Sequence, residues 1–129
     1  MDIKKPGLYS PLVLAYIGDG AYELYVRNRL IRENPDLPPN KLHKLATTHV
    51  KAKAQSRAMV LIEPTLTEAE LSIYKRGRNA KSATVPKNAD VSEYRRATGF
   101  EALVGYVYLL GDIKRVEEIM EIAYNSSTN

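Results

Sequence analysis

The chain has 129 residues, a formal net charge of +4 and no cysteine, with 26% charged and 44% hydrophobic residues. This length suits one domain, expected to span residues 1–129 with frayed ends at about 1–7 and 125–129. The missing cysteines exclude disulfides and thiolate metal sites, and no apolar run reaches the roughly 18 residues of a membrane span, so we expect a soluble cytoplasmic protein.

The first half of the chain predicts two long helices. Ser10 followed by proline is a helix start signal, and apolar residues then recur at three- and four-residue steps to about Glu33. The prolines of 35–39 end this helix. A second helix is expected over about 40–63, and its two histidines fit no nucleophile pattern.

A third helix begins at Thr65 or Thr67 and is expected to end near Gly77, where a basic loop over 78–89 begins. Residues 75–96 carry seven basic groups against two acidic ones. Such a stripe attracts phosphate backbones, although a solvated protein face has a similar composition.

Asp90 or Ser92 caps a fourth helix to about Leu110, and a fifth helix covers about 113–124. No segment has the alternating pattern of a strand. The sequence therefore predicts an all-α fold of about five main helices plus short turns.

Two acids lie in segments that are apolar on most of their circumference. Asp19 sits in the first helix between Gly18 and Gly20, and Glu101 sits in the fourth helix between Gly99 and Gly105. An unpaired buried carboxylate is costly, and glycine within a helix needs a spatial reason such as close backbone approach.

Two interpretations of these acids stay open on the pattern alone. In the first, arginines such as Arg95 or Arg96 satisfy them. In the second, Asp19 and Glu101 form one carboxylate site for a hard cation, since Mg²⁺ needs only one or two carboxylates besides water. Next to a basic stripe, a metal site of this kind indicates metal-dependent hydrolysis of nucleic acid.

At these positions the sequence resembles the ribonuclease III family. The resemblance rests on four motifs in order: the signature helix at 14–23, Lys-Arg-Gly-Arg-Asn-Ala-Lys-Ser at 75–82, Pro-Lys-Asn-Ala-Asp at 86–90 and Thr-Gly-Phe-Glu-Ala-Leu-Val-Gly-Tyr at 98–106. The match is closest to the Mini-ribonuclease III branch, which lacks a double-stranded-RNA-binding domain, and covers about residues 8–124. Two acids of full-length ribonuclease III are replaced by Ala15 and Thr98, as in that branch.

The resemblance implies a homodimeric, Mg²⁺-dependent endoribonuclease that cleaves double-stranded RNA to 5′-phosphate and 3′-hydroxyl ends. For this branch it implies the 23S ribosomal RNA precursor as substrate, with a ribosomal protein as a candidate partner. It implies Asp19 and Glu101 as the catalytic and metal-binding residues. Glu23 and Thr98, each one helical turn from one of these acids, are candidates to contact the metal through water.

The basic loop and the helix before it are the expected RNA-binding region. Double-stranded RNA is recognised mainly by shape and by phosphate and 2′-hydroxyl contacts. The candidates for these contacts are Arg76, Arg78, Asn79, Lys81, Lys87 and Asn88.

Two other functions compete with this interpretation. One is a non-catalytic helical module that binds double-stranded RNA during ribosome assembly. The other is a helical adaptor whose glycines serve packing alone. Acids within the groove distinguish the enzyme, because a phosphate-binding module gains nothing from Asp19 and Glu101.

Overall fold

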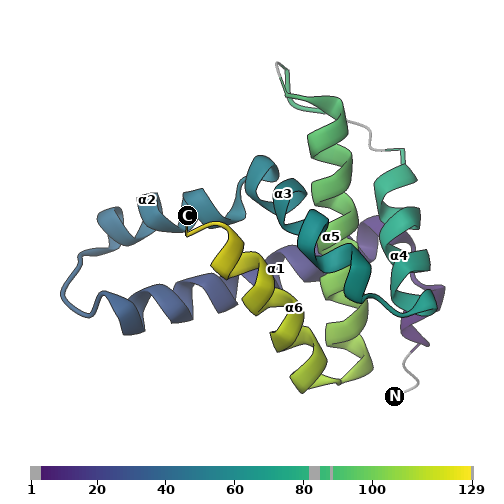
Figure 1. Ribbon diagram of the computed structural model, residues 1–129, viewed down its shortest axis with the longest axis horizontal. Coiled ribbons are helices and arrows are strands. Elements are labelled where there is room, and N and C mark those ends of the chain that lie inside the picture. Colours follow the sequence, from purple (N-terminus) through teal and green to yellow (C-terminus); the bar gives the residue numbers. More distant parts are fainter. Residues whose placement is uncertain (1–3, 82–84, 88, 129) are drawn as a thin grey trace.

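Figure 1 shows a computed structural model that describes residues 4–81, 85–87 and 89–128. Over these residues it contains helices and no strands, so the all-α fold is confirmed. In chain order the elements are η1 (Pro6–Leu8), α1 (Pro11–Glu33), α2 (Pro39–Val50), α3 (Ala52–Ile62), η2 (Glu63–Thr65), α4 (Glu68–Asn79), α5 (Val91–Leu110) and α6 (Ile113–Ser126). No helix among the described residues is long and apolar enough to cross a membrane.

Side-chain caps begin three of these helices where the sequence predicts. The hydroxyl of Ser10 accepts a hydrogen bond from the backbone of α1, and the Asp90 carboxylate does the same for α5. Thr67 caps α4 through a reciprocal pair of bonds with Glu70. These bonds satisfy backbone N–H groups that have no partner within the helix.

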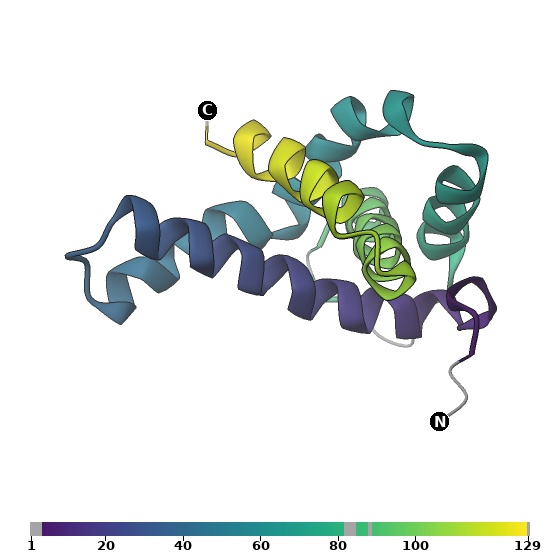
Figure 2. The same cartoon turned by 90° about the horizontal axis from the view of Figure 1, so that it is seen from below.

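Helix α5 is the centre of the molecule. Seen from below, it is viewed almost end-on, with α1 running across one side and α3, α4 and α6 around the others (Figure 2). It buries nine residues, and Phe100, Ala102, Leu103 and Val104 are fully enclosed. An acid on α5 is therefore held in place by four neighbouring helices.

The predicted second helix is in fact two helices, so a single helix over 40–63 is wrong. At Lys51 the backbone is extended, with φ −64° and ψ 153°, and α3 starts one residue later. Neither glycine nor proline marks this break. The carbonyl of Val50 at the end of α2 instead accepts a hydrogen bond from the Gln55 side chain of α3, at 3.0 Å.

Two glycines let the backbones of α1 and α5 touch. A Cβ atom on Gly18 would lie 1.8 Å from the carbonyl oxygen of Glu101, and one on Gly105 would lie 1.9 Å from that of Leu14. Any side chain at either position would force the helices apart. The expected close approach of two helices is thus confirmed at Gly18 and Gly105.

The other glycines differ from the prediction. Gly99 packs against Tyr74 of α4 rather than against α1. Gly77 does not end its helix, since α4 continues to Asn79, and its missing side chain instead makes room for Ala102 and Gly99 of α5. Gly20 has open space where a Cβ would be.

Residues near both ends of the described chain contact other elements. Gly7 lies in η1, and its carbonyl accepts a hydrogen bond from Arg76 at 3.1 Å. Near the other end, Ser127 is hydrogen-bonded to His49 of α2, whose ring stacks on Tyr124 at 4.1 Å. His49 is thus a buried structural histidine.

Candidate active site

The crossing of α1 and α5 brings Asp19 and Glu101 together. Gly18 lies directly against the backbone of Glu101, and Asp19 is the next residue along α1. The Asp19 side chain lies close enough to the Glu101 carboxyl to raise its pKa. Glu101 is partly buried, whereas Asp19 is exposed, so the expectation that both acids are buried is wrong for Asp19.

The Glu101 carboxyl is strongly perturbed. Burial raises its pKa from an ordinary 4.5 to about 9, and the neighbouring Asp19 carboxyl adds to the rise. At neutral pH the metal-free protein therefore keeps a proton on Glu101.

Neither arginine considered in the sequence neutralises this pair through an observed ion pair. Arg96 donates to the hydroxyls of Ser56 and Ser92, at 2.6 and 2.7 Å. Arg95 is exposed at the start of α5. Over the described residues the ion pairs are Arg27–Glu23, Arg29–Glu33 and Arg115–Glu70. None of these ion pairs includes Asp19 or Glu101.

The raised pKa of Glu101 predicts how stability depends on pH. Between about pH 4.5 and 9 the folded metal-free protein holds a proton that the unfolded chain releases, so the free energy of unfolding falls as pH rises through this window. Glu101→Gln removes this proton linkage and should raise that free energy by on the order of 2 kcal/mol at neutral pH. Urea unfolding with a chelator, at several pH values, measures both effects, and equal pH slopes for the two proteins would contradict them.

The two residues expected to act through water already have other partners. Glu23 accepts a hydrogen bond from Arg27 at 2.9 Å, although its charge still acts on Glu101. The Thr98 hydroxyl donates to the carbonyl of Tyr94 at 3.0 Å, within its own helix. Asp19 and Glu101 therefore form the centre of the site.

Of the expected RNA-binding residues, Arg76 has an additional structural role. Its guanidinium donates to the carbonyls of Gly7 and Tyr9, at 3.1 and 3.4 Å, and so ties the N-terminal segment to α4. Arg78 donates to Asn79 at 3.2 Å and lies over the ring of Tyr74. No local pattern predicts these contacts, because they depend on the tertiary fold.

Lys81 and Arg95 line a cavity of about 290 Å³ between the end of α4 and the start of α5. The cavity also reaches Thr98, one helical turn from Glu101. Lys87 is exposed, and Asn88 lies outside the described residues. Two basic side chains therefore line a cavity that reaches to within one helical turn of Glu101.

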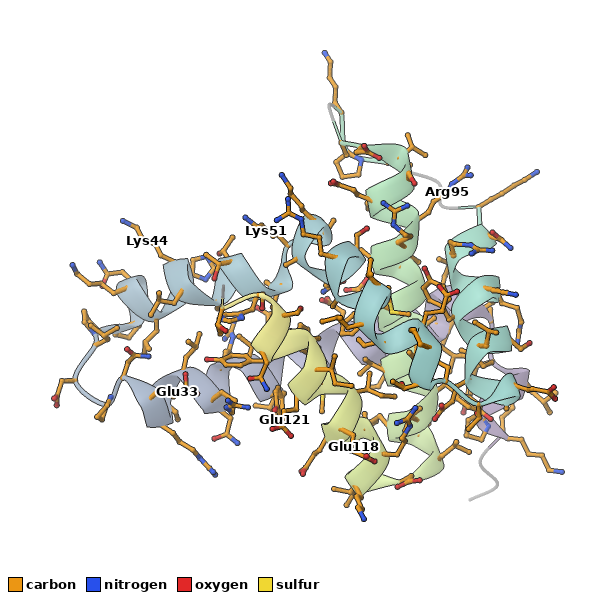
Figure 3. The ribbon with its side chains drawn as sticks, viewed as in Figure 1. Glu33, Lys44, Lys51, Arg95, Glu118 and Glu121 are labelled. Carbon is orange, nitrogen blue, oxygen red and sulfur yellow. The ribbon has the colours of Figure 1, made fainter. Side chains whose placement is uncertain are left out.

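In Figure 3, Lys44, Lys51 and Arg95 lie on the side of the molecule where α5 begins, whereas Glu33, Glu118 and Glu121 lie on the side formed by α6 and the end of α1. Basic side chains on the first side can attract a phosphate backbone.

One residue of the site was missed from the sequence. Gln55 of α3 is buried, with 3% of its surface exposed, and its side chain acts on the carboxyl of Glu101, whose pKa it lowers. A polar residue among the alanines of the inner face of α3 is the signal that could have identified it.

Among the residues that the structure describes, no three acids or histidines gather closely enough to form a metal cage. The donor set of Asp19 and Glu101 nevertheless fits Mg²⁺, which keeps several waters and binds proteins through one or two carboxylates.

The ribonuclease III domain model matches residues 12–112 of the chain. The chain belongs to the ribonuclease III family. It is 51% identical to a Mini-ribonuclease 3 of Clostridium tetani, over 90% of this chain and 77% of that protein. It is 50% identical to a Mini-ribonuclease 3 of Brevibacillus brevis, over 94% and 90%. A crystal structure of a Fusobacterium nucleatum protein superposes with a TM-score of 0.80 at 35% identity, covering 89% of this chain and 91% of that one.

Membership in this family establishes the class of activity. The protein is an endoribonuclease of the type that cleaves double-stranded RNA. The family works as a dimer and is generally metal-dependent. The prediction of a non-catalytic module is therefore set aside in favour of the enzyme.

Proposed function

We propose that this protein is a Mg²⁺-dependent endoribonuclease in which Asp19 and Glu101 hold the metal ion. The observation that carries the proposal is the contact between these two carboxyl groups at the α1–α5 crossing, beside the basic start of α5. We further propose that its substrate is the paired ends of the 23S ribosomal RNA precursor, and that it acts in the cytoplasm as a single domain spanning residues 1–129.

Each residue of the pair has a distinct part in the reaction. When bound, Mg²⁺ supplies Lewis-acid stabilisation of the phosphoryl group and activates water. Asp19, which is exposed, and Glu101, which is partly buried, would together hold the ion when it binds. Glu101 would serve as a ligand only in its ionised form, and hydrolysis leaves 5′-phosphate and 3′-hydroxyl ends. Glu23 contributes negative charge from one turn away.

A cleavage assay tests the proposed substrate. Purified protein is incubated with a duplex that carries the paired ends of the 23S precursor, with Mg²⁺ or with a chelator. Discrete Mg²⁺-dependent cuts on both strands support the proposal. Cleavage of unrelated duplexes at the same rate would contradict the substrate assignment, and cleavage only when a ribosomal protein is added would assign that protein as a partner.

The RNA-binding proposal predicts how affinity depends on salt. Arg76, Arg78, Asn79, Lys81, Lys87 and Asn88 are the proposed contacts. Lys81→Ala or Lys87→Ala should each lower the slope of log affinity against log salt by about one, since each lost phosphate contact releases one fewer counterion. Duplex binding with a chelator present measures the slope. Lys114→Ala, at the start of α6, is the control, and an equal change in that variant would contradict the proposed surface.

We also propose that the exposed apolar face of α1 forms the dimer interface. Tyr16 is 82% exposed and Leu24 is 70% exposed. Leu24 borders a largely apolar hollow of about 420 Å³, lined also by Tyr108 and Ile113. A face of this kind is typical of a surface covered by another copy.

Leu24→Asp should therefore weaken dimerisation about a hundredfold, because it buries an unpaired charge in the interface. Sedimentation equilibrium measures the effect. Val60→Asp is the matched control, since Val60 is 75% exposed on α3. A Leu24→Asp protein that remains as dimeric as the control would place the interface elsewhere.

A further inference from the structure

Gln55 is the most deeply buried polar side chain near the acidic pair. It lies on the inner face of α3, where its neighbours Ala54, Ala58 and Met59 are buried too. Burial of an amide is costly unless it is hydrogen-bonded. The groups that Gln55 contacts therefore explain why a polar side chain occupies this buried position.

Gln55 has two partners on two different helices. Its Nε2 donates to the carbonyl of Val50 at 3.0 Å, which fixes the amide against the end of α2. The same side chain lies close enough to the carboxyl of Glu101 on α5 to favour its ionised form. A backbone group thus fixes the amide in a position next to the carboxyl.

The chemistry of an amide suits this position. A lysine or arginine would also hydrogen-bond Glu101, but its charge would neutralise the carboxylate and compete with a metal ion. A neutral amide orients the carboxylate without neutralising it. This matters here because Ala15 and Thr98 carry no charge, which leaves few groups to hold a cation.

We propose that Gln55 is a positioning residue that holds the Glu101 carboxylate beside Asp19 in the orientation needed to bind Mg²⁺. The inference rests on the proposed metal-binding roles of Asp19 and Glu101. Partners of this kind behind a metal ligand typically contribute about 10- to 100-fold to metal affinity or activity.

The test measures metal binding without RNA. Mn²⁺, which shares the preference of Mg²⁺ for carboxylate and water, is titrated into metal-free protein, and free Mn²⁺ is followed by electron paramagnetic resonance. Gln55→Met keeps the volume and removes the amide, and Gln55→Asn keeps the amide but shortens its reach. Both should bind Mn²⁺ about tenfold more weakly than the wild type. In Mg²⁺-dependent cleavage, kcat should fall about tenfold while KM for the duplex stays unchanged.

Ser56→Ala is the matched control. Ser56 is equally buried on α3, with 4% exposed, but its partner is Arg96. We expect it to lower the unfolding free energy and to leave Mn²⁺ affinity unchanged. A folded Gln55→Met or Gln55→Asn protein that binds Mn²⁺ as tightly as the wild type would overturn the inference. If instead the Asp19→Asn protein binds Mn²⁺ as tightly as the wild type, the proposed metal site itself is wrong.

Discussion

Asp19→Asn and Glu101→Gln are expected to fold, to bind duplex RNA, and to cleave it about a thousandfold more slowly than the wild type, a loss of about 4 kcal/mol in transition-state stabilisation. The reason is that each variant keeps the shape of the side chain but removes one of the two carboxylates that contact each other at the α1–α5 crossing. Single-turnover cleavage of an end-labelled duplex, at saturating protein, measures the effect without interference from product release.

Glu121→Gln is the control for this prediction. Glu121 lies on α6, on the acidic side of the molecule, and should tolerate the same loss of charge with full activity (Figure 3). The cleavage rate of Glu23→Gln should lie between that of the control and those of the Asp19 and Glu101 variants, with a loss of only about threefold. Its carboxylate acts on Glu101 at a distance and is paired with Arg27. A wild-type rate in either Asp19→Asn or Glu101→Gln would contradict the assignment of the pair.

Gly18→Ala and Gly105→Ala are each expected to lower the free energy of unfolding by about 3 kcal/mol or more. In each variant the new methyl group would lie less than 2 Å from a backbone carbonyl oxygen of the facing helix, with contacts of 1.8 and 1.9 Å. A backbone atom cannot rotate away as a flexible side chain can. The helices must therefore separate, which also moves Asp19 away from Glu101. Urea unfolding measures the loss.

Gly20→Ala is the matched control within the same helix. Its added methyl meets no atom within 4 Å, so the better helix propensity of alanine should stabilise the protein by up to about 1 kcal/mol. Because Gly20 lies between Tyr16 and Leu24 on the proposed dimer face, the oligomeric state is measured alongside. Equal losses in Gly18→Ala and Gly20→Ala would show that helix propensity, and not the crossing, is responsible.

Much of the fold follows from local signals in the sequence. The caps at Ser10, Thr67 and Asp90 and the spacing of apolar residues place α1, α4 and α5 where they were predicted. The break at Lys51 was not predictable in this way. It has no glycine or proline, and its extended backbone follows from the packing of α3 on α5 and from the bond between Gln55 and Val50.

Some features of the candidate site are likewise predictable from the sequence, and others are not. Asp19 and Glu101 stand out in the sequence because both interrupt apolar helices, and the glycines beside them pointed to close approach. The exposure of Asp19 and the role of Gln55 depend on how the helices are placed around α5, and no local pattern encodes that. Likewise, Arg76 was predicted from its charge alone, and its bonds to Gly7 and Tyr9 emerge only in the folded chain.

The central claim is that Asp19 and Glu101 together hold the metal ion of this ribonuclease. Crystals of the protein soaked in Mn²⁺ test it most directly, because anomalous scattering locates that ion without assumptions about the reaction. We predict one peak between the two carboxyl groups, lost in crystals of Glu101→Gln. A peak that persists in that variant, or Mn²⁺ bound only at other residues, would contradict the account.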